Sequence, residues 1–395
     1  MSLDSATDSK LSNQRARSFG LQSTVLWQSY WVTPRTFATL LAFSSLLGIC
    51  GHASAGVLRI VDWNIEADIN GVTTPRAGLN TVLQGMGNEI LAGDAQPIDI
   101  MALEETTSNA TTVAPIVTDL NTDYGAGTYA MSSYQATESG NDPTDGNGPN
   151  ALIYNTTTVT LLASVGVGTP GGSSNGEYRQ VVRYEFEPVG GTSPFYIYVS
   201  HMKSGTSGSD ATARGEEATI IRNDEATLPA NSSVMYMGDL NSAPPEAEFT
   251  NFTAAGQGQA FDPYSFSSSI QYWSDSTTSL HYRDDYQLMT SDVLNDTGAI
   301  NYVSGTLNNM GNNGTTASGK STNLGTNTAL SYMNGGVYGS GNYPTQSQVL
   351  SALTTASDHL PDLADYTFSA VPEPTCVALL ATGASALLIR RRPRR

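Results

Sequence analysis

Residues 56–65 of this chain read Gly-Val-Leu-Arg-Ile-Val-Asp-Trp-Asn-Ile, an apolar run of strand length that ends in polar side chains. A second run, residues 98–103, is apolar enough for a buried strand and leads into Glu104 and Glu105. Between them, apolar residues recur at helical spacing from about residue 76 to residue 91, which predicts a helix. The two strands are expected to present their polar ends to one site.

Further strand-like runs follow along the chain, separated by clusters of Gly, Pro, Asn and Asp. They are residues 151–154, 180–186, 195–199, 233–237 and 286–289. Charged residues make up 14% of the chain and there are 38 glycines, which favours a loop-rich, β-heavy protein over a helical bundle. Several strands with a few helices between them predict a two-sheet sandwich with helices outside.

The N-terminal residues 1–55 are predicted to be a leader with a signal peptide. Arg35 precedes an apolar stretch from about residue 36 to residue 50, and the stretch closes on Ala53-Ser54-Ala55. Small residues in an A-x-A arrangement form the kind of site that signal peptidases cut, and the apolar part is short for a membrane span. We therefore expect the protein to be exported.

The C-terminal residues 371–395 have a similar segmented pattern. Val371-Pro372-Glu373-Pro374 leads into an apolar run over residues 377–389 and then into a basic cap at residues 390–395. This tail resembles the PEP-CTERM sorting signal of bacterial envelope proteins, which implies transient membrane association and later removal by a sorting protease. A plain C-terminal membrane anchor is the alternative interpretation.

Without these two ends the chain is strongly acidic. Residues 56–370 hold nine Lys and Arg against 33 Asp and Glu, a formal charge of −24. Such a surface repels polyanions, including nucleic acid and anionic membranes. The two cysteines, Cys50 and Cys376, fall in the predicted leader and tail, so residues 56–370 contain no cysteine. A metal bound by this domain would therefore need oxygen and imidazole ligands.

Polar residues capable of acid–base or metal chemistry stand repeatedly at the ends of the apolar runs. They are Asn64, Glu105, His201, Asp239, Asn241, Asp285, Asp358 and His359. Strand ends that converge on one rim commonly build active sites in sandwiches and α/β sheets. The sequence has no H-E-x-x-H motif. Each residue alone is more often a cap, a turn or a structural side chain.

Six short motifs occur in a fixed order and carry a family resemblance. They are Asp62-Trp63-Asn64-Ile65, Asp99-Ile100-Met101-Ala102-Leu103-Glu104-Glu105, Val199-Ser200-His201-Met202-Lys203, Gly238-Asp239-Leu240-Asn241, Arg283-Asp284-Asp285-Tyr286 and Ser357-Asp358-His359-Leu360-Pro361. Together they resemble the endonuclease/exonuclease/phosphatase superfamily of deoxyribonuclease-I-like enzymes. The implied fold is α+β, a four-layer α/β sandwich of two packed, mostly antiparallel sheets flanked by helices.

The resemblance implies a divalent-cation site built on carboxylates. Glu105 is expected to be the main ligand of Mg²⁺, or of Mn²⁺ or Ca²⁺, because such cations prefer oxygen ligands. Asn64 is expected to assist as a neutral oxygen donor or through water. Asp358 is expected to be a second metal ligand.

The same resemblance assigns the catalytic groups. His359 would activate or orient the nucleophile, and Asp285 would hydrogen-bond its imidazole and fix the tautomer. Asp239 and Asn241 would align the water and the phosphate, with Asn241 also counted among the phosphate-binding groups. His201 would donate to a phosphate oxygen or to the leaving group.

Other positions are less typical of the family. Arg179, ahead of a predicted strand, is a candidate phosphate clamp. Glu104 replaces the usual Gln of its motif, and Asp284 replaces an apolar residue beside Asp285. Residues 308–346 are rich in Gly, Asn, Thr and Ser and read as an irregular insertion within one domain of residues 56–370.

The predicted function is therefore an exported, metal-dependent phosphoesterase acting as a monomer, with an extracellular nuclease as the first candidate. A lipid or small-molecule phosphodiesterase is an alternative, because few basic residues remain to track a nucleic-acid backbone. A catalytically silent envelope binding protein on the same fold is a further alternative, since one fold hosts several functions.

Overall fold

The computed structural model describes residues 56–67, 72–137, 148–169, 179–242, 246–266, 275–280, 282–312, 330 and 343–369. The predicted leader (1–55) and sorting tail (371–395) lie outside these ranges, as does most of the predicted insertion. Among the described residues, none of the helices combines the length and the apolar character that a membrane span requires.

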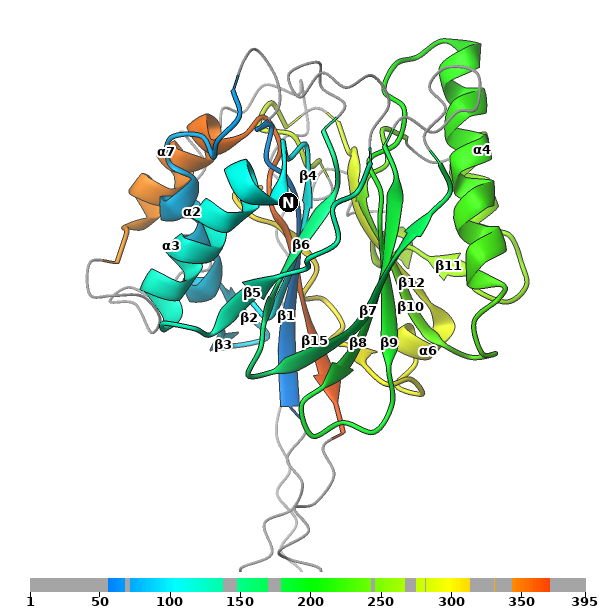
Figure 1. The fold of residues 1–395 in the computed structure, drawn as a ribbon, viewed down its shortest axis with the longest axis horizontal. Coiled ribbons are helices and arrows are strands. Elements are labelled where there is room, and N and C mark those ends of the chain that lie inside the picture. Colours follow the sequence, from blue (N-terminus) through cyan, green and yellow to red (C-terminus); the bar gives the residue numbers. More distant parts are fainter. Residues whose placement is uncertain are drawn as a thin grey trace, which may run out of the picture. The chain divides into compact units, whose positions relative to one another are not determined.

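Two large sheets form the centre of the domain (Figure 1). The strands of the first sheet are β1 (Gly56–Asn64), β4 (Ile100–Glu104), β5 (Tyr129–Met131), β6 (Ala151–Asn155), β13 (Asn301–Tyr302), β14 (Asn308–Asn309) and β15 (Asp362–Phe368). Their order is β13-β15-β1-β4-β6-β5, and β14 also pairs with β15. Strand β1 is thus a central strand, which is why most of its residues are buried on both faces.

The second sheet has the order β11-β12-β10-β9-β8-β7. Its strands are β7 (Val159–Val167), β8 (Val181–Pro188), β9 (Phe195–Val199), β10 (Ser233–Asp239), β11 (Ala260–Phe261) and β12 (Asp285–Thr290). A separate two-stranded ribbon pairs β2 (Ile90–Leu91) with β3 (Asp94–Ala95). Each large sheet contains one parallel pair, β1 with β4 and β9 with β10, and the other pairs are antiparallel.

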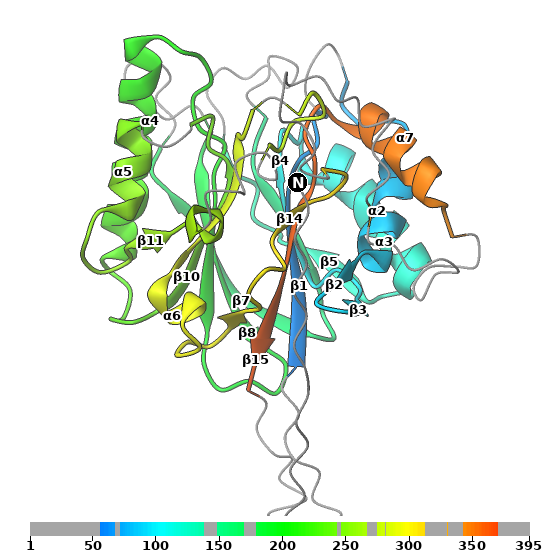
Figure 2. The same cartoon turned by 180° about the vertical axis from the view of Figure 1, so that it is seen from behind.

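Helices cover the outer faces of both sheets (Figures 1 and 2). The first sheet is covered by α2 (Leu79–Asn88), α3 (Ala114–Tyr124) and α7 (Gln346–Ala356), and the second by α4 (Gly208–Glu225) and α5 (Ala247–Thr253). Shorter helical elements are α6 (Ser291–Leu294), a π-helical turn η1 (Asn109–Val113) and a 3₁₀ turn η3 (Pro263–Phe266). The predicted four-layer sandwich is confirmed.

The helix predicted over residues 76–91 is shorter than expected. It begins after Gly78, whose φ of 90° lies in the left-handed region and cannot continue a right-handed helix. It ends at Asn88, and the last predicted residues form strand β2 instead.

Three hydrophobic cores separate the four layers. The alternation of β1 shows the arrangement: Leu58 and Ile60 face the space between the sheets, whereas Val61 and Trp63 face the helices of the first layer. Strand β10 likewise turns Met235 and Met237 inward and its other face toward α4 and α5. The inner core is apolar along most of its length and becomes polar only at one end, where the strand-end motifs lie.

A fully buried arginine joins the first sheet to its helices. The Arg59 guanidinium donates to Asp365 on β15 at 2.9 and 3.1 Å and to the carbonyls of Met86 and Glu89 at 2.8 and 2.7 Å. These carbonyls lie at the end of α2, where helical carbonyls need donors from elsewhere. Arg59 therefore fixes α2 against two central strands.

We expect Arg59→Met to lower the free energy of unfolding by about 3–5 kcal/mol, because it leaves the Asp365 carboxylate buried without its partner. Urea unfolding followed by circular dichroism measures the change. Arg183→Met is the matched control, since its ion pair with Asp224 is partly exposed and is expected to contribute no more than about 1 kcal/mol. Equal losses in the two variants would contradict this account of Arg59.

Candidate active site

The strand-end residues meet at one end of the space between the sheets. The parallel strands β1 and β4 end there, as do β9 and β10, while the antiparallel strands β12 and β15 begin there. The register places Asp285 opposite Asp239 within the second sheet. Residues that are far apart in the sequence therefore become neighbours because of the topology alone.

Two carboxylates from different sheets face each other across this end. The Asn64 amide nitrogen lies 2.9 Å from Glu105 Oε1 and 3.1 Å from Asp239 Oδ2, so it bridges the two sheets. The side-chain Oδ1 of Asn64 accepts from the backbone N–H of Glu66 at 3.1 Å. Asn64 was predicted to assist the metal as an oxygen donor or through water; in the structure its amide nitrogen also holds Glu105 and Asp239 in place.

The backbone bends sharply where two of these side chains are presented. Glu105 and Asn241 have φ values of 52° and 47°, a left-handed conformation that non-glycine residues rarely adopt. Within the G-D-L-N motif, a Cβ on Gly238 would lie 1.9 Å from the Ser200 carbonyl oxygen. Only glycine allows the strands carrying Asp239 and His201 to approach this closely.

His201 lies beside both carboxylates. Its Nε2 is 3.3 Å from Asp239 Oδ2 and 3.8 Å from Glu105 Oε1. Burial, followed by the positive charges of Arg179 and His359, lowers the pKa of His201 well below its ordinary value. The ring is therefore neutral and can either donate a proton in a hydrogen bond or ligate a cation.

Arg179 is buried beside the segment that carries His201. Its side chain has 3% of its surface exposed, and one guanidinium nitrogen, Nη1, donates to the carbonyls of His201 and Met202 at 3.3 and 3.2 Å. Asn241 donates to the same Met202 carbonyl at 3.2 Å. Arg179 therefore supports this segment, and its role as a phosphate clamp stays a prediction.

His359 and Asp285 form a close pair. His359 Nδ1 lies 2.7 Å from Asp285 Oδ2, and Nε2 lies 3.8 Å from Asp239 Oδ2. Burial alone would lower the pKa of His359, but Asp285, Asp239 and Asp358 outweigh it and raise the pKa well above its ordinary value. Burial of Asp239 raises its pKa to about 7, although the positive charge of His359 lowers this pKa in part.

The rim of the site is acidic. Asp358, predicted to be a metal ligand, has a side chain that is 66% exposed, and it lies 3.9 Å from His359 Nε2. Burial and the neighbouring Asp285 raise the pKa of Asp284 to about 6, and burial followed by Asp358 raises the pKa of Glu66. Asp358 therefore lies on the outer rim and apart from the buried carboxylates.

Two sets of side chains have the composition and spacing that a cation needs. Glu105, His201 and Asp239 form one, and Asp239, Asp285 and His359 form the other, with potential ligand atoms within 4.8 Å of one another in each set. Asp285 Oδ1 is buried and accepts no hydrogen bond from the described part of the chain. Such oxygen-rich groups fit a hard divalent cation, with Asp239 common to both sets.

A second pair of carboxyls lies directly beneath this site. Asp62 and Glu104 are both fully buried, on neighbouring strands and on the same face. Burial raises the pKa of both carboxyls well above the ordinary range. The charge of Glu104 adds to this effect at Asp62, and the charge of Asp285 adds to it at Glu104. The protonated form of each carboxyl is therefore favoured. The pair was not among the predicted site residues.

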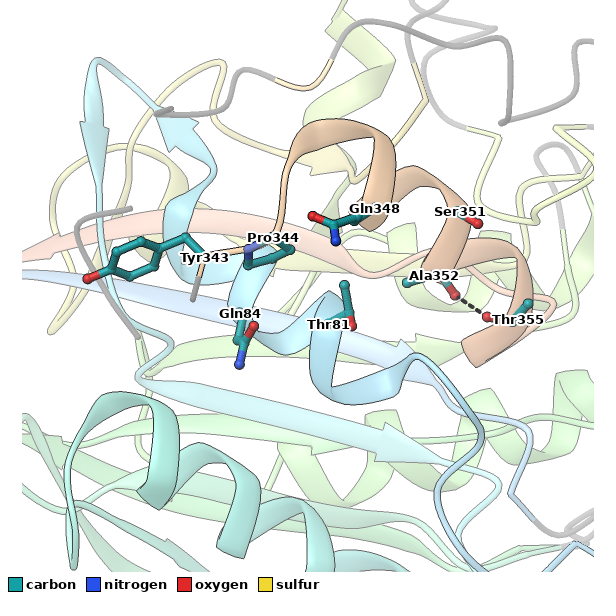
Figure 3. Close-up of a pocket in the computed structure, with 8 residues that line it drawn as sticks. All are labelled: Thr81, Gln84, Tyr343, Pro344, Gln348, Ser351, Ala352 and Thr355. Carbon is teal, nitrogen blue, oxygen red and sulfur yellow. Dashed lines mark hydrogen bonds between the residues drawn. The ribbon is translucent and has the colours of Figure 1, made fainter. Parts of the chain in front are cut away.

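The outer helix layer carries a separate groove of about 770 Å³ between α2 and α7 (Figure 3). Hydroxyl and amide side chains line most of it, among them Thr81, Gln84, Gln348 and Ser351. Among the described residues that line it there is no carboxylate and no imidazole. The chemistry is therefore placed at the strand ends and not in this groove.

The raised pKa values predict an unusual pH dependence of stability without metal. Asp62, Glu104, Asp239 and His359 bind protons more tightly in the folded than in the unfolded chain. The stability that these groups contribute is complete at pH values below their pKa values in the unfolded chain. It is lost as the pH rises through their pKa values in the folded chain. The lowered pKa of His201 has the opposite effect on stability, but it is one group against these four.

We therefore expect the melting temperature in chelator to be lower at pH 8 than at pH 5, by an amount equivalent to more than about 1.4 kcal/mol. Added Mg²⁺ or Mn²⁺ should raise it more at pH 8 than at pH 5, because cations bind the ionised carboxylates. Calorimetry at the two pH values measures both effects. A melting temperature in chelator that rises from pH 5 to pH 8 would count against this electrostatic account.

Several solved structures are similar to this chain. The human Nocturnin catalytic domain is similar in structure at 17% identity, with 80% of this chain and 97% of that chain covered and a TM-score of 0.49. An endonuclease/exonuclease/phosphatase from Bacteroides vulgatus is similar at 13% identity, 79% and 99% coverage and a TM-score of 0.47. D. rerio TDP2 in complex with single-strand DNA product is similar at 14% identity, 79% and 99% coverage and a TM-score of 0.44.

A search of curated proteins finds no match. The family profile described as Endonuclease/Exonuclease/phosphatase family matches residues 63–359, more than half of the chain. This range begins at the Trp63 that donates to the His359 carbonyl at 3.1 Å and ends at His359 itself. The chain accordingly belongs to the endonuclease/exonuclease/phosphatase family.

Proposed function

We propose that this protein is a metal-dependent phosphoesterase that hydrolyses phosphodiester or phosphomonoester bonds. The observation that carries the proposal is the Asp285–His359 pair at 2.7 Å, beside the carboxylates of Glu105 and Asp239. Hydrolysis of a phosphoester needs a proton-transfer group and positive charge near the phosphoryl oxygens. The site supports both requirements within one end of the sandwich.

The carboxylates suit a divalent cation such as Mg²⁺, Mn²⁺ or Ca²⁺. Glu105 and Asp239 would hold it, with His201 as a further ligand or as a hydrogen-bond donor. When bound, the cation would supply charge that stabilises the phosphoryl oxygens and offsets the field of the buried carboxylates.

The protein side chains would move and orient the protons. Asp285 accepts from His359 Nδ1, which leaves Nε2 directed toward Asp239 and free to exchange a proton with water. Neutral His201 would donate to a phosphate oxygen or the leaving group. Asn241, whose backbone N–H donates to Asp239 Oδ1 at 3.0 Å, would align the phosphate.

The family resemblance makes an extracellular nuclease the first candidate substrate class. The acidic rim of Glu66, Asp284 and Asp358 favours a second one, a lipid or small phosphodiester, because it repels a long polyanion. Two cations of the described chain are paired with carboxylates: Arg76 lies 2.9 Å from Glu66 and Lys203 lies 3.5 Å from Asp210. If DNA is bound mainly through its charge, its hydrolysis should fall steeply as the salt concentration rises, whereas hydrolysis of a small phosphodiester should change little.

Export is proposed on the sequence of the two ends. The segment 1–55 would direct the chain across the membrane, and residues 371–395 would hold it there until a sorting protease acts. Cell fractionation of the full chain and of a chain ending at residue 370 tests this: the shorter form should leave the membrane fraction. A monomer is the expected state, which light scattering checks.

The activity is tested with purified protein, Mg²⁺, Mn²⁺, Ca²⁺ or chelator, and plasmid DNA, RNA, bis(p-nitrophenyl) phosphate, p-nitrophenyl phosphate and sphingomyelin. We expect metal-dependent turnover, and a loss of at least about a hundredfold in kcat/KM for His359→Ala and Glu105→Ala. His359→Ala removes the proton-transfer group, and Glu105→Ala removes a carboxylate of the cation site.

Glu187→Ala is the matched control, because Glu187 lies near the end of β8 that is remote from the site. Turnover that persists in both site variants would assign the activity to other residues or to a contaminant. A folded protein that binds metal and hydrolyses none of the substrates would favour the binding role instead.

A further inference from the structure

A serine outside the six motifs lies directly behind the Asp285–His359 pair. Ser276 is completely buried, and its Oγ accepts hydrogen bonds from the backbone N–H groups of Asp284 and Asp285, each at 3.0 Å. Its own backbone N–H donates to the Tyr282 carbonyl at 2.8 Å. The hydroxyl therefore fixes the first residue of β12, the residue whose side chain meets His359.

The same serine also contacts the segment that carries His359. The Ser276 carbonyl accepts from the backbone N–H of Leu360 at 2.6 Å. Two residues later, Thr278 donates to the Asp358 carbonyl at 2.7 Å, and Thr277 forms an isolated antiparallel bridge with His359. Residues on both sides of His359 are thus tied to the short segment around Ser276.

We propose that Ser276 is a positioning residue that sets the placement of Asp285 relative to His359. This inference rests on the proposed function, in which that pair transfers the proton. In the described part of the chain, Ser276 forms no hydrogen bond with either side chain of the pair. It acts through the backbone, with its hydroxyl on the Asp285 side and its carbonyl on the His359 side.

A short hydrogen bond forms only when its two groups are held at a narrow range of distances and angles. The pair is 2.7 Å apart, and catalytic groups must be held to within about 0.5 Å of their working geometry. Ser276→Ala removes the acceptor of two backbone N–H groups, which must then find other partners. A shift of the Asp285 backbone by a fraction of an ångström moves its carboxylate away from His359 Nδ1.

Three variants of the full chain separate positioning from general stability. Ser276→Ala removes the acceptor, and Ser276→Thr keeps an oxygen at the same place. Ser233→Ala is the matched control: Ser233 is also buried, and its Oγ accepts from the backbone N–H of Ala299 at 2.7 Å. Ser233 begins β10 whereas Asp239 ends it, so the control lies about 20 Å from the site.

For Ser276→Ala we expect kcat to fall about tenfold to a hundredfold with KM nearly unchanged. Ser233→Ala should keep wild-type kcat although its melting temperature also falls, and Ser276→Thr should regain most of the activity. Equal kcat values in Ser276→Ala and Ser233→Ala would overturn the proposal.

A second measurement does not need a substrate. The chain has four histidines, and ¹⁵N labelling of their rings, with His359→Asn for assignment, reports the Nδ1 proton shared with Asp285. We expect this resonance to move or vanish in Ser276→Ala and to stay in Ser233→Ala. If it moves but wild type hydrolyses nothing, the positioning role stands and the proposed activity fails; an unmoved resonance refutes the positioning role.

Discussion

Buried negative charge in excess of positive charge is the constraint on which this site depends. Glu105, Asp239 and Asp285 meet Asp62 and Glu104 at one end of the inner core, and His359 is the histidine whose raised pKa favours a positive charge among them. Carboxylates in such surroundings must either hold protons or face a cation. Without metal, the pKa values of Asp239, Asp62 and Glu104 are accordingly raised.

The fold produces this crowding through strand direction. Each sheet has one parallel pair, and the two pairs end on the same side of the molecule, so four chain segments leave the core together (Figure 1). The antiparallel strands β12 and β15 enter at that place and bring Asp285 and the residues after His359. The apolar remainder of the core supplies stability, which allows one end to be electrostatically unfavourable.

Much of this could be predicted from the sequence. The runs that became β1, β4, β9 and β10 are apolar on both faces, and the polar residue at each end marks where the chain leaves the core. The ordered motifs place Glu105, Asp239, Asp285 and His359 in one set on the sequence alone. Such signals depend on local pattern, and local pattern is what a sequence shows directly.

Other features depend on distant contacts and gave a weaker signal. Strand β15 contains two buried aspartates, Asp362 and Asp365, and so does not resemble a core strand; Asp365 is tolerated there because Arg59 meets it. Arg179 was predicted to be a phosphate clamp, and nothing in the sequence indicated that its Nη1 holds the carbonyls of the His201 segment.

Two more residues illustrate the same limit. Asp62 could have been noticed, since alternation along β1 puts it on the same face as Asn64. Ser276 could not, because its role arises only where three segments meet.

The pairing of β1 with β15 has a mechanical consequence. Gly56 and Phe368 are direct partners at the end of this antiparallel pair, so the first and last described strands leave the domain side by side, away from the active site (Figures 1 and 2). A pulling force applied at Gly56 and Phe368 would separate β1 from β15 one residue pair at a time, beginning at this end. If the force acted in shear along the strands, all the hydrogen bonds of the pair would share it. The last residue pair before the site joins Asp62 to Asp362, so tension strong enough to run through the whole pair would reach the catalytic residues only at the end.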